Sequence, residues 1–255
     1  MSGLHFRSAG PIEQRVRQFY SSTLCRFGIV PHVMRAQRAR FLVDPSDVID
    51  RCIVMFGMWE RDQLEALAAL ATARKIDYFL DIGANSGFYS VMFAIKNLAE
   101  RIIAFEPDPH NYARLIRNLN ANALAGRVEA IPLAVGDEAS EVTLYQGAKS
   151  NLGESTIVVP EQTPQEVIFR VRQARFDDLY AISGKTLIVK IDVEGYEFHV
   201  LAGMERTLRE NACYLQIEHY GVREEELKAR LAGFGYRYLR IEQIDLYFTN
   251  MPDVN

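Results

Sequence analysis

The sequence predicts an α/β protein with a mostly parallel sheet covered by helices on both faces, and three observations support that prediction. Short apolar runs alternate with amphipathic helical segments along most of the 255 residues, as in repeated strand–helix–strand units. One run, Ile76–Ile82, leads directly into a turn with two glycines, Gly83 and Gly87, and then into a helical segment. Acidic residues follow several of the runs, at the carboxyl ends of strands where α/β sheets bind ligands.

Residues 1–75 are predicted to form an N-terminal extension that packs on the core. It contains a candidate helix at Pro11–Phe27, one or two short strands within Phe41–Met55, and an alanine-rich helix at Gln63–Ala73. Arginines recur as far as Arg40, so this end of the chain is locally basic. We interpret the arginines as a solvated helix face. The alternative is a surface for an anionic substrate, a membrane lipid headgroup or a partner, including a second copy of the chain.

Residues 76–255 are predicted to form the α/β core. Strands are expected at Arg101–Phe105, Val128–Val135, Thr186–Ile191 and Ala212–Ile217, with a closing hairpin at Gly235–Ile241 and Ile244–Phe248. Helices are expected at Phe88–Ile95, Asp108–Ala123, Phe176–Ile182, Glu197–Arg209 and Arg223–Ala232. Residues 141–171 break this alternation and predict an antiparallel β insertion or lid beside the active site. Its strands are expected at Val142–Tyr145, Thr156–Val159 and Val167–Val171, with a polar loop at Gly147–Ser155.

Composition and charge argue against several classes of protein. The net charge of −4 gives no basic footprint for nucleic acid over the whole chain. The three cysteines, Cys25, Cys52 and Cys213, lack metal-site spacing and are typical of buried thiols in a reducing compartment. No apolar run approaches the roughly 20 residues that span a bilayer, and the first residues lack the apolar core of a secretory signal. We therefore expect a cytoplasmic protein.

The residues around the glycine turn indicate the kind of ligand. The two glycines lack the three-glycine pattern of dinucleotide folds; Gly83 allows a tight turn, and Gly87 allows backbone to approach a ligand. Asp81, just before the first glycine, would repel a pyrophosphate and attract a cation. Glu106, after the second strand, is placed to accept hydrogen bonds from both hydroxyls of a ribose. A ligand with a ribose, a positive centre and no phosphate matches S-adenosylmethionine.

Three ordered motifs carry a resemblance to a known family. They are Asp81-Ile-Gly-Ala-Asn-Ser-Gly-Phe-Tyr-Ser, Ala104-Phe-Glu-Pro-Asp-Pro with the following Asn111, and Lys190-Ile-Asp-Val-Glu-Gly-Tyr-Glu. From about Trp59 to Glu218 the sequence resembles the FkbM-type S-adenosylmethionine-dependent methyltransferases. The resemblance implies a class I methyltransferase fold, Rossmann-like with a seven-stranded, mostly parallel sheet. It also implies O-methylation of a hydroxyl on a sugar, a glycolipid or a natural product.

The resemblance further implies which residues bind the cofactor. Those expected to contact it are Asp81, Gly83, Asn85 and Gly87 at the methionine portion, Phe88 and Ser90 at the helix start, Glu106 and Pro107 at the ribose, Ala134, Val135 and Asp137 at the adenine, and Asp192 at the reacting centre. Ser90 could instead cap the helix, and Phe88 could instead be a core aromatic. Glu60 could contact the cofactor. Alternatively, Trp59 and Glu60 could serve only to pack their helix against the sheet.

A hydroxyl acceptor benefits from a general base. His219 is the one histidine expected at a strand end and is the first candidate, with a structural hydrogen-bonding role as the alternative. Glu194 and Asp192 are the next candidates for catalysis. Asp192, Glu218 and His219 could instead hold a divalent cation, as acids at neighbouring strand ends do in catechol-type O-methyltransferases, but we expect a site without metal.

Two other functions remain open on the sequence alone. A nicotinamide-dependent oxidoreductase would share the fold, although the missing third glycine and Asp81 argue against it. A non-catalytic protein that only binds the cofactor is the other alternative. The expected partner is a small-molecule or glycan acceptor rather than nucleic acid. The sequence names neither the acceptor nor the atom that is methylated, and it leaves the oligomeric state open.

Overall fold

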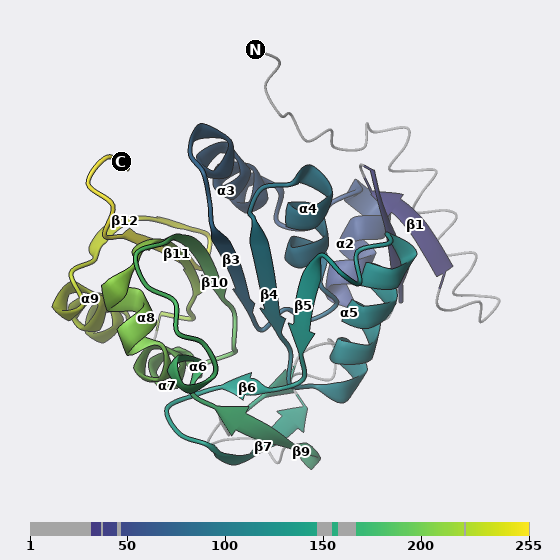
Figure 1. The fold of residues 1–255 in the computed structure, drawn as a ribbon. Helices are drawn as coiled ribbons and strands as arrows, with labels where there is room; N and C mark the ends of the chain where they lie inside the picture. Colours follow the sequence, from purple (N-terminus) through teal and green to yellow (C-terminus); the bar gives the residue numbers. More distant parts are fainter. Residues whose placement is uncertain are drawn as a thin grey trace.

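A seven-stranded sheet forms the centre of the computed structural model, which describes residues 32–36, 38–44, 47–146, 155–157, 167–221 and 223–254 (Figure 1). In chain order the strands are β3 (Tyr78–Ile82), β4 (Arg101–Phe105), β5 (Val128–Ile131), β10 (Thr186–Ile191), β11 (Ala212–Glu218), β12 (Arg237–Glu242) and β13 (Asp245–Thr249). Their order across the sheet is β12-β13-β11-β10-β3-β4-β5. The β11–β13 and β13–β12 pairs are antiparallel and the other four adjacent pairs are parallel, so the predicted mostly parallel sheet is confirmed.

Helices cover both faces of this sheet because the strands bury apolar side chains on both sides. Alternate residues of β3 show this: Phe79 packs into one buried cluster, with Phe93 stacked on it at 3.7 Å between ring centroids, and Leu80 packs into the other. The first face carries α2 (Val48–Phe56), α3 (Arg61–Ala73), α4 (Phe88–Lys96) and α5 (Pro109–Ala121). The second carries α6 (Phe176–Leu179), α7 (Glu197–Gly203), α8 (Glu205–Glu210) and α9 (Glu224–Gly233).

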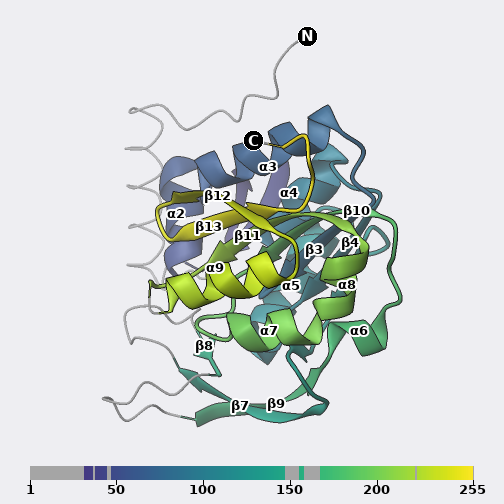
Figure 2. The ribbon, with the colours of Figure 1, turned by 90° about the vertical axis from the view of Figure 1, so that its left-hand side faces the viewer.

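A second, smaller sheet matches the predicted β insertion. Its strands β6 (Ala134–Val135), β7 (Ser140–Gln146), β8 (Ser155–Thr156) and β9 (Val167–Ala174) pair in the order β6-β9-β7-β8. Figures 1 and 2 show β7 and β9 at the bottom of the molecule, beyond the end of the main sheet that is opposite α3. Thr156 ties the small sheet to the main one, because its hydroxyl donates a 2.8 Å hydrogen bond to the carbonyl of Glu194. Residues 147–154 of the predicted polar loop lie outside the described residues.

The segment before the glycine turn differs from the prediction at one place. Strands β1 (His32–Ala36) and β2 (Ala39–Val43) form a hairpin, but the expected strand structure after residue 47 is wrong, since α2 begins there. Asp47 caps this helix by accepting a 3.0 Å hydrogen bond from the N–H of Asp50, and Arg114 of α5 bonds both carboxylates. The β-branched residues of α2 bury one helical face at Ile53 and Val54. The predicted helix Pro11–Phe27 lies outside the described residues.

Two predicted elements of the core are each split in two. The strand expected at Val128–Val135 ends at Ile131, because Pro132 has no N–H for the ladder, and Ala134–Val135 pairs instead with β9 in the small sheet. The helix expected at Glu197–Arg209 breaks after Gly203, where a side chain would lie 1.9 Å from the carbonyl oxygen of Gly136. Within the described ranges, no helix combines the length and the apolar character that crossing a bilayer requires.

Candidate functional site

A cavity of about 540 Å³ opens over the carboxyl ends of the parallel strands, within the usual size range of small-ligand sites. Residues that follow four strands reach it: Gly83 after β3, Glu106 after β4, Asp192 after β10 and Glu218 at the end of β11. This is the edge of an α/β sheet at which ligands bind, because strand ends and helix starts leave polar groups free there. The remaining walls come from α2, the start of α3, the small sheet and the β12–β13 turn.

The cavity separates the predicted cofactor residues into two groups. Those that line it are Glu60, Gly83, Asn85, Glu106, Pro107, Ala134, Val135 and Asp192. Among the described residues, the predicted ones that do not line it are Asp81, Gly87, Phe88, Ser90 and Asp137. Most of the predicted residues that do not line the cavity belong to β3, the glycine turn or α4, where they contribute to packing and hydrogen bonding within this unit.

Asp81 and Ser90 show this supporting role most clearly. One carboxylate oxygen of Asp81 accepts 2.6 Å and 3.2 Å hydrogen bonds from the hydroxyl and the N–H of Ser90, in the first turn of α4. Burial raises the pKa of Asp81 despite the nearby charge of Lys190 and these bonds. A carboxylate at a helix N-terminus satisfies N–H groups and the helix dipole. Phe88 is likewise buried, against Phe41 at 5.3 Å between ring centroids.

Both glycines have positive φ angles, +84° at Gly83 and +83° at Gly87, but their surroundings differ. A Cβ at Gly83 would lie 1.8 Å from the carbonyl oxygen of Asp192, so this glycine lets the ends of β3 and β10 approach each other. A Cβ at Gly87 would lie 2.3 Å from the side chain of Leu115 on α5. Gly87 was predicted to let the backbone approach a ligand. In the structure, the absence of a side chain at Gly87 instead leaves room for Leu115 of α5.

Glu106 is fixed by backbone donors at the predicted ribose position. Its two carboxylate oxygens accept hydrogen bonds from the N–H groups of Asn85, at 2.7 Å, and Asp108, at 2.8 Å. Each oxygen keeps a second lone pair that can accept a further bond from a ligand. Burial raises the pKa of Glu106 to about 8, although both backbone bonds oppose the shift. A ligand that donates two hydroxyl groups would stabilise the ionised form.

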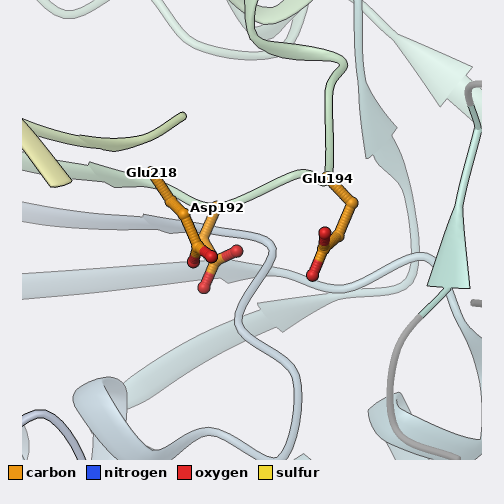
Figure 3. A group of neighbouring side chains, drawn as sticks. All are labelled: Asp192, Glu194 and Glu218. Atoms are coloured by element: carbon orange, nitrogen blue, oxygen red, sulfur yellow. The ribbon is translucent and has the colours of Figure 1, made fainter. Parts of the chain in front are cut away.

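A cluster of charged groups lies at the ends of β10 and β11. Lys190 contacts Asp192 at 2.6 Å, and the burial that would lower the pKa of Lys190 is outweighed by the surrounding carboxylates, which hold it well above its usual value. Lys190 in turn keeps the pKa of Asp192 low against the effect of burial. Burial and the neighbouring Asp192 raise the pKa of Glu218, which favours its protonated form. Figure 3 shows these two carboxyl groups side by side.

Glu194 completes an acidic group with Asp192 and Glu218. Carboxylate oxygens of these three residues lie within 4.8 Å of one another and could hold a cation (Figure 3). The alternative metal site that the sequence suggested included His219, which this group does not contain. The cation hypothesis therefore involves Glu194 in place of His219.

His219, the first candidate base, lies behind this group. It is buried and absent from the described residues that line the cavity. Its Nδ1 lies 3.4 Å from a carboxylate oxygen of Glu197, and its Nε2 has no hydrogen-bond partner within the described part of the chain. His219 as the base stays a prediction that this geometry does not favour. Asp137, expected near the adenine, contacts His199 at 3.1 Å instead.

Glu60 lines the cavity from the start of α3. One of its carboxylate oxygens accepts a 2.6 Å hydrogen bond from the hydroxyl of Tyr89. Burial raises the pKa of Glu60 to about 7, and the charge of Lys190 and the Tyr89 bond moderate the shift. Burial and the adjacent Glu60 raise the pKa of Tyr89 well above its usual value, so the phenol remains a donor.

Several residues that line the cavity were not predicted from the sequence. They include Ile49, Cys52, Phe56 and Met58 before α3, Tyr220 after β11, and Gln243, Ile244 and Asp245 at the β12–β13 turn. Phe56, Tyr220 and Ile244 are large apolar side chains that are also exposed, which is typical of residues at a cavity mouth. No local motif marks them, because they come together only through the pairing of distant strands.

The sheet order and the cavity at its carboxyl edge define the class I, Rossmann-like methyltransferase fold. A family model described as the methyltransferase FkbM domain matches residues 81–243. The chain belongs to the FkbM methyltransferase family, which confirms the resemblance seen in the motifs.

Characterised relatives agree with this assignment. The chain is 28% identical over 197 residues to the hexuronic acid methyltransferase AglP of Haloferax volcanii, covering 76% of each chain. It is 30% identical over 204 residues to the 31-O-demethyl-FK506 methyltransferase FkbM of Streptomyces tacrolimicus, covering 69% of this chain and 72% of that protein. The crystal structure of an FkbM methyltransferase from Methylobacillus flagellatus KT is similar with 19% identity and a TM-score of 0.47. That likeness covers 68% of this chain and 43% of the other.

Proposed function

We propose that the protein is an S-adenosylmethionine-dependent O-methyltransferase that acts on a hydroxyl of a sugar, a glycolipid or a natural product. The observation that carries the proposal is Glu106, a backbone-anchored carboxylate with spare lone pairs on the cavity wall at the end of β4. The relatives named above are a hexuronic acid methyltransferase and a 31-O-demethyl-FK506 methyltransferase, and the second name specifies an oxygen, which supports an oxygen acceptor.

The charge of the cavity wall suits a cationic cofactor. The described lining residues include the acids Glu60, Asp62, Glu106, Asp192, Glu194, Glu218 and Asp245, and among them Arg61 is the one basic residue. The ionised acids of this wall attract a ligand that carries ammonium and sulfonium charges and repel a pyrophosphate. Such a ligand would also favour the ionised forms of Glu60 and Glu106, whose pKa values are raised by burial. The same argument disfavours the nicotinamide alternative, as does membership of a methyltransferase family.

The chain's own residues would position the reactants. When bound, S-adenosylmethionine supplies a methyl group that is already activated for displacement. Glu106 would hold the ribose hydroxyls, and Gly83 keeps the end of β3 close to Asp192 at the cavity floor. Lys190 keeps Asp192 ionised beside the place expected for positive charge. Alignment of the acceptor in a closed pocket then supplies most of the rate enhancement.

Calorimetry with the full chain tests the proposal. We expect S-adenosylmethionine and S-adenosylhomocysteine to bind and NADH not to bind. Transfer of a labelled methyl group is then measured on a panel of neutral methyl glycosides, a hexuronic acid glycoside and a macrolide polyol. Binding of NADH alone would overturn the proposal. Binding of S-adenosylmethionine without transfer to any acceptor would favour the non-catalytic alternative.

We also propose that transfer needs no metal. The support is that Lys190 already pairs with Asp192 at 2.6 Å and holds the pKa of that carboxyl low, so this member of the acidic group has a cation beside it. Chelation should leave the rate unchanged. A rate that is lost in chelator and restored by magnesium would instead assign Asp192, Glu194 and Glu218 as its ligands.

A further inference from the structure

We propose that Glu60 is the general base of the transfer, positioned by Tyr89, and that His219 is not. The proposal rests on the proposed function and adds a catalytic residue to it. Four observations lead to it. Three concern Glu60 itself: its backbone conformation, the position of its carboxylate in the cavity, and its hydrogen bond from Tyr89. The fourth is that other acids of the cavity are already paired with other groups.

The backbone of Glu60 is held in a conformation that glutamate rarely adopts. Its φ and ψ angles of 40° and 58° are left-handed, although the residue has a Cβ. Strain of this kind persists where the surrounding structure enforces it, and such residues cluster at functional sites. Glu60 occupies the N-cap position of α3, where an acidic side chain usually bonds the N–H groups of its own helix.

The carboxylate of Glu60 does not cap the helix. It makes no side-chain cap bond within the described α3; instead it lines the cavity and accepts the bond from Tyr89. Tyr89 is buried and held in turn, since its oxygen lies 3.5 Å from the amide nitrogen of Gln216, which donates a 3.0 Å bond to Asp245. A base whose orientation is set by a second group, itself held by a third, is the usual arrangement of a proton-transfer site.

Four other acids on the wall, Glu106, Asp192, Glu218 and Asp245, have described partners. Glu106 accepts hydrogen bonds from two backbone N–H groups, Asp192 is paired with Lys190, and Glu218 accepts a 2.9 Å bond from the hydroxyl of Tyr220. Asp245 accepts from Gln216. Glu60 differs from Asp192 because its described partner is a neutral phenol, and within the described residues it has no ion pair in contact.

The charged groups that face Glu60 set its proton affinity. Burial raises its pKa to about 7; Lys190 lowers it, Asp192 and Asp245 raise it, and the bond from Tyr89 lowers it. A base that titrates near neutral pH combines a useful ionised fraction with enough basicity to accept a proton. The acceptor hydroxyl would give its proton to Glu60, keep the O–H electron pair on oxygen, and form the new O–CH₃ bond. The methyl group leaves its donor without the old bonding pair, which stays on the donor.

Direct titration of Glu60 tests the inference without an acceptor. Carbon-13 NMR of the full chain, labelled at glutamate carboxyl carbons, should show a resonance titrating near pH 7 that disappears in Glu60→Gln. In Tyr89→Phe, which loses the donor that stabilises the carboxylate, the same resonance should titrate at higher pH. Glu65→Gln, in the same helix and paired with Arg61, should leave it unchanged. A Glu60 resonance that titrates in the ordinary acidic range would overturn the inference.

Kinetics on the acceptor found in the labelled-methyl screen supply the second readout. Glu60→Gln should lower turnover by about 10²–10⁴-fold and remove the rise of rate with pH, with little change in S-adenosylhomocysteine affinity. Tyr89→Phe should shift that rise to higher pH. Full activity of Glu60→Gln would overturn the inference and leave the proposed function intact, whereas failure to bind S-adenosylmethionine in the wild type would overturn the proposed function.

Discussion

The two halves of the cavity are built in different ways. The glycine-turn half, formed by Gly83, Asn85 and Glu106, comes from one stretch of chain, and its acid is held by backbone N–H groups. The acidic half, formed by Glu60, Asp192, Glu218 and Asp245 near Lys190, comes from four distant segments, and side chains hold its acids. Lys190 pairs with Asp192, Tyr89 donates to Glu60, and Gln216 donates to Asp245. Backbone donors fix the position of Glu106 whatever the side chains around it, whereas each acid of the second half depends on the side chains that face it.

Replacing Lys190 should be the most damaging single change to the acidic half. Lys190→Met leaves Asp192 and its neighbours buried without their cation, and we expect a loss of about 3–5 kcal/mol in the free energy of unfolding. Because Lys190 holds the pKa of Asp192 low, the stabilisation is present above the unfolded pKa of about 4 and is lost as pH falls through the lower, folded pKa. Urea titrations should therefore show wild type and variant converging in acid.

The matched control for this change is Lys185→Met, at an exposed position just before the same strand. It should change stability by less than about 0.5 kcal/mol. A Lys190→Met protein as stable as the control would mean that the acids of this half are protonated rather than coupled to the lysine.

In the glycine-turn half, the largest loss of stability is expected from a substitution that strains the backbone. Gly83→Ala places a Cβ against the carbonyl oxygen of Asp192 at a positive φ angle, so we expect a loss of about 2–4 kcal/mol in the free energy of unfolding. The loss should be independent of pH, in contrast to that of Lys190→Met. Gly126→Ala is the control, because nothing lies within 4 Å of a Cβ there. Equal stability of the two alanine variants would show that the β3 and β10 ends are not in close contact.

Glu106 tests whether the glycine-turn half binds the cofactor. Glu106→Gln should weaken S-adenosylhomocysteine binding by roughly 1–3 kcal/mol, the loss for a charge-assisted hydrogen bond. Calorimetry on the folded variant measures this, with Glu100→Gln, at an exposed site before the same strand, as the control. Unchanged affinity would remove the observation on which the proposed function depends.

Substitution of His219 is expected to have the smallest effect on stability and turnover. The result distinguishes the two candidate bases, His219 and Glu60. His219→Gln keeps a hydrogen-bonding side chain near Glu197, so we expect a stability loss of about 1 kcal/mol or less and turnover close to wild type. A turnover loss of about 10²-fold or more would restore His219 as the base and contradict the assignment of Glu60.

The glycine-turn half could be predicted from the sequence because its order in the chain is nearly its order in space. β4 and β10 have the predicted residue bounds, and Gly83, Asn85 and Glu106 line the cavity as expected. The errors occur where local patterns are ambiguous. The apolar β-branched run after Asp47 forms a helix because that residue caps it, and the β5 region divides at Pro132 because proline cannot continue the ladder.

The sequence by itself determined the class of fold, the family and the edge of the sheet at which ligands bind, because apolar periodicity and motif order are properties of neighbouring residues. Tertiary structure alone decided that Leu115 occupies the space beside Gly87, that His219 lies behind Glu197, and that Tyr89 meets Glu60. These contacts join residues far apart in the chain. The charge state of each buried acid then depends on how deeply it is desolvated and which charges face it, and packing sets both.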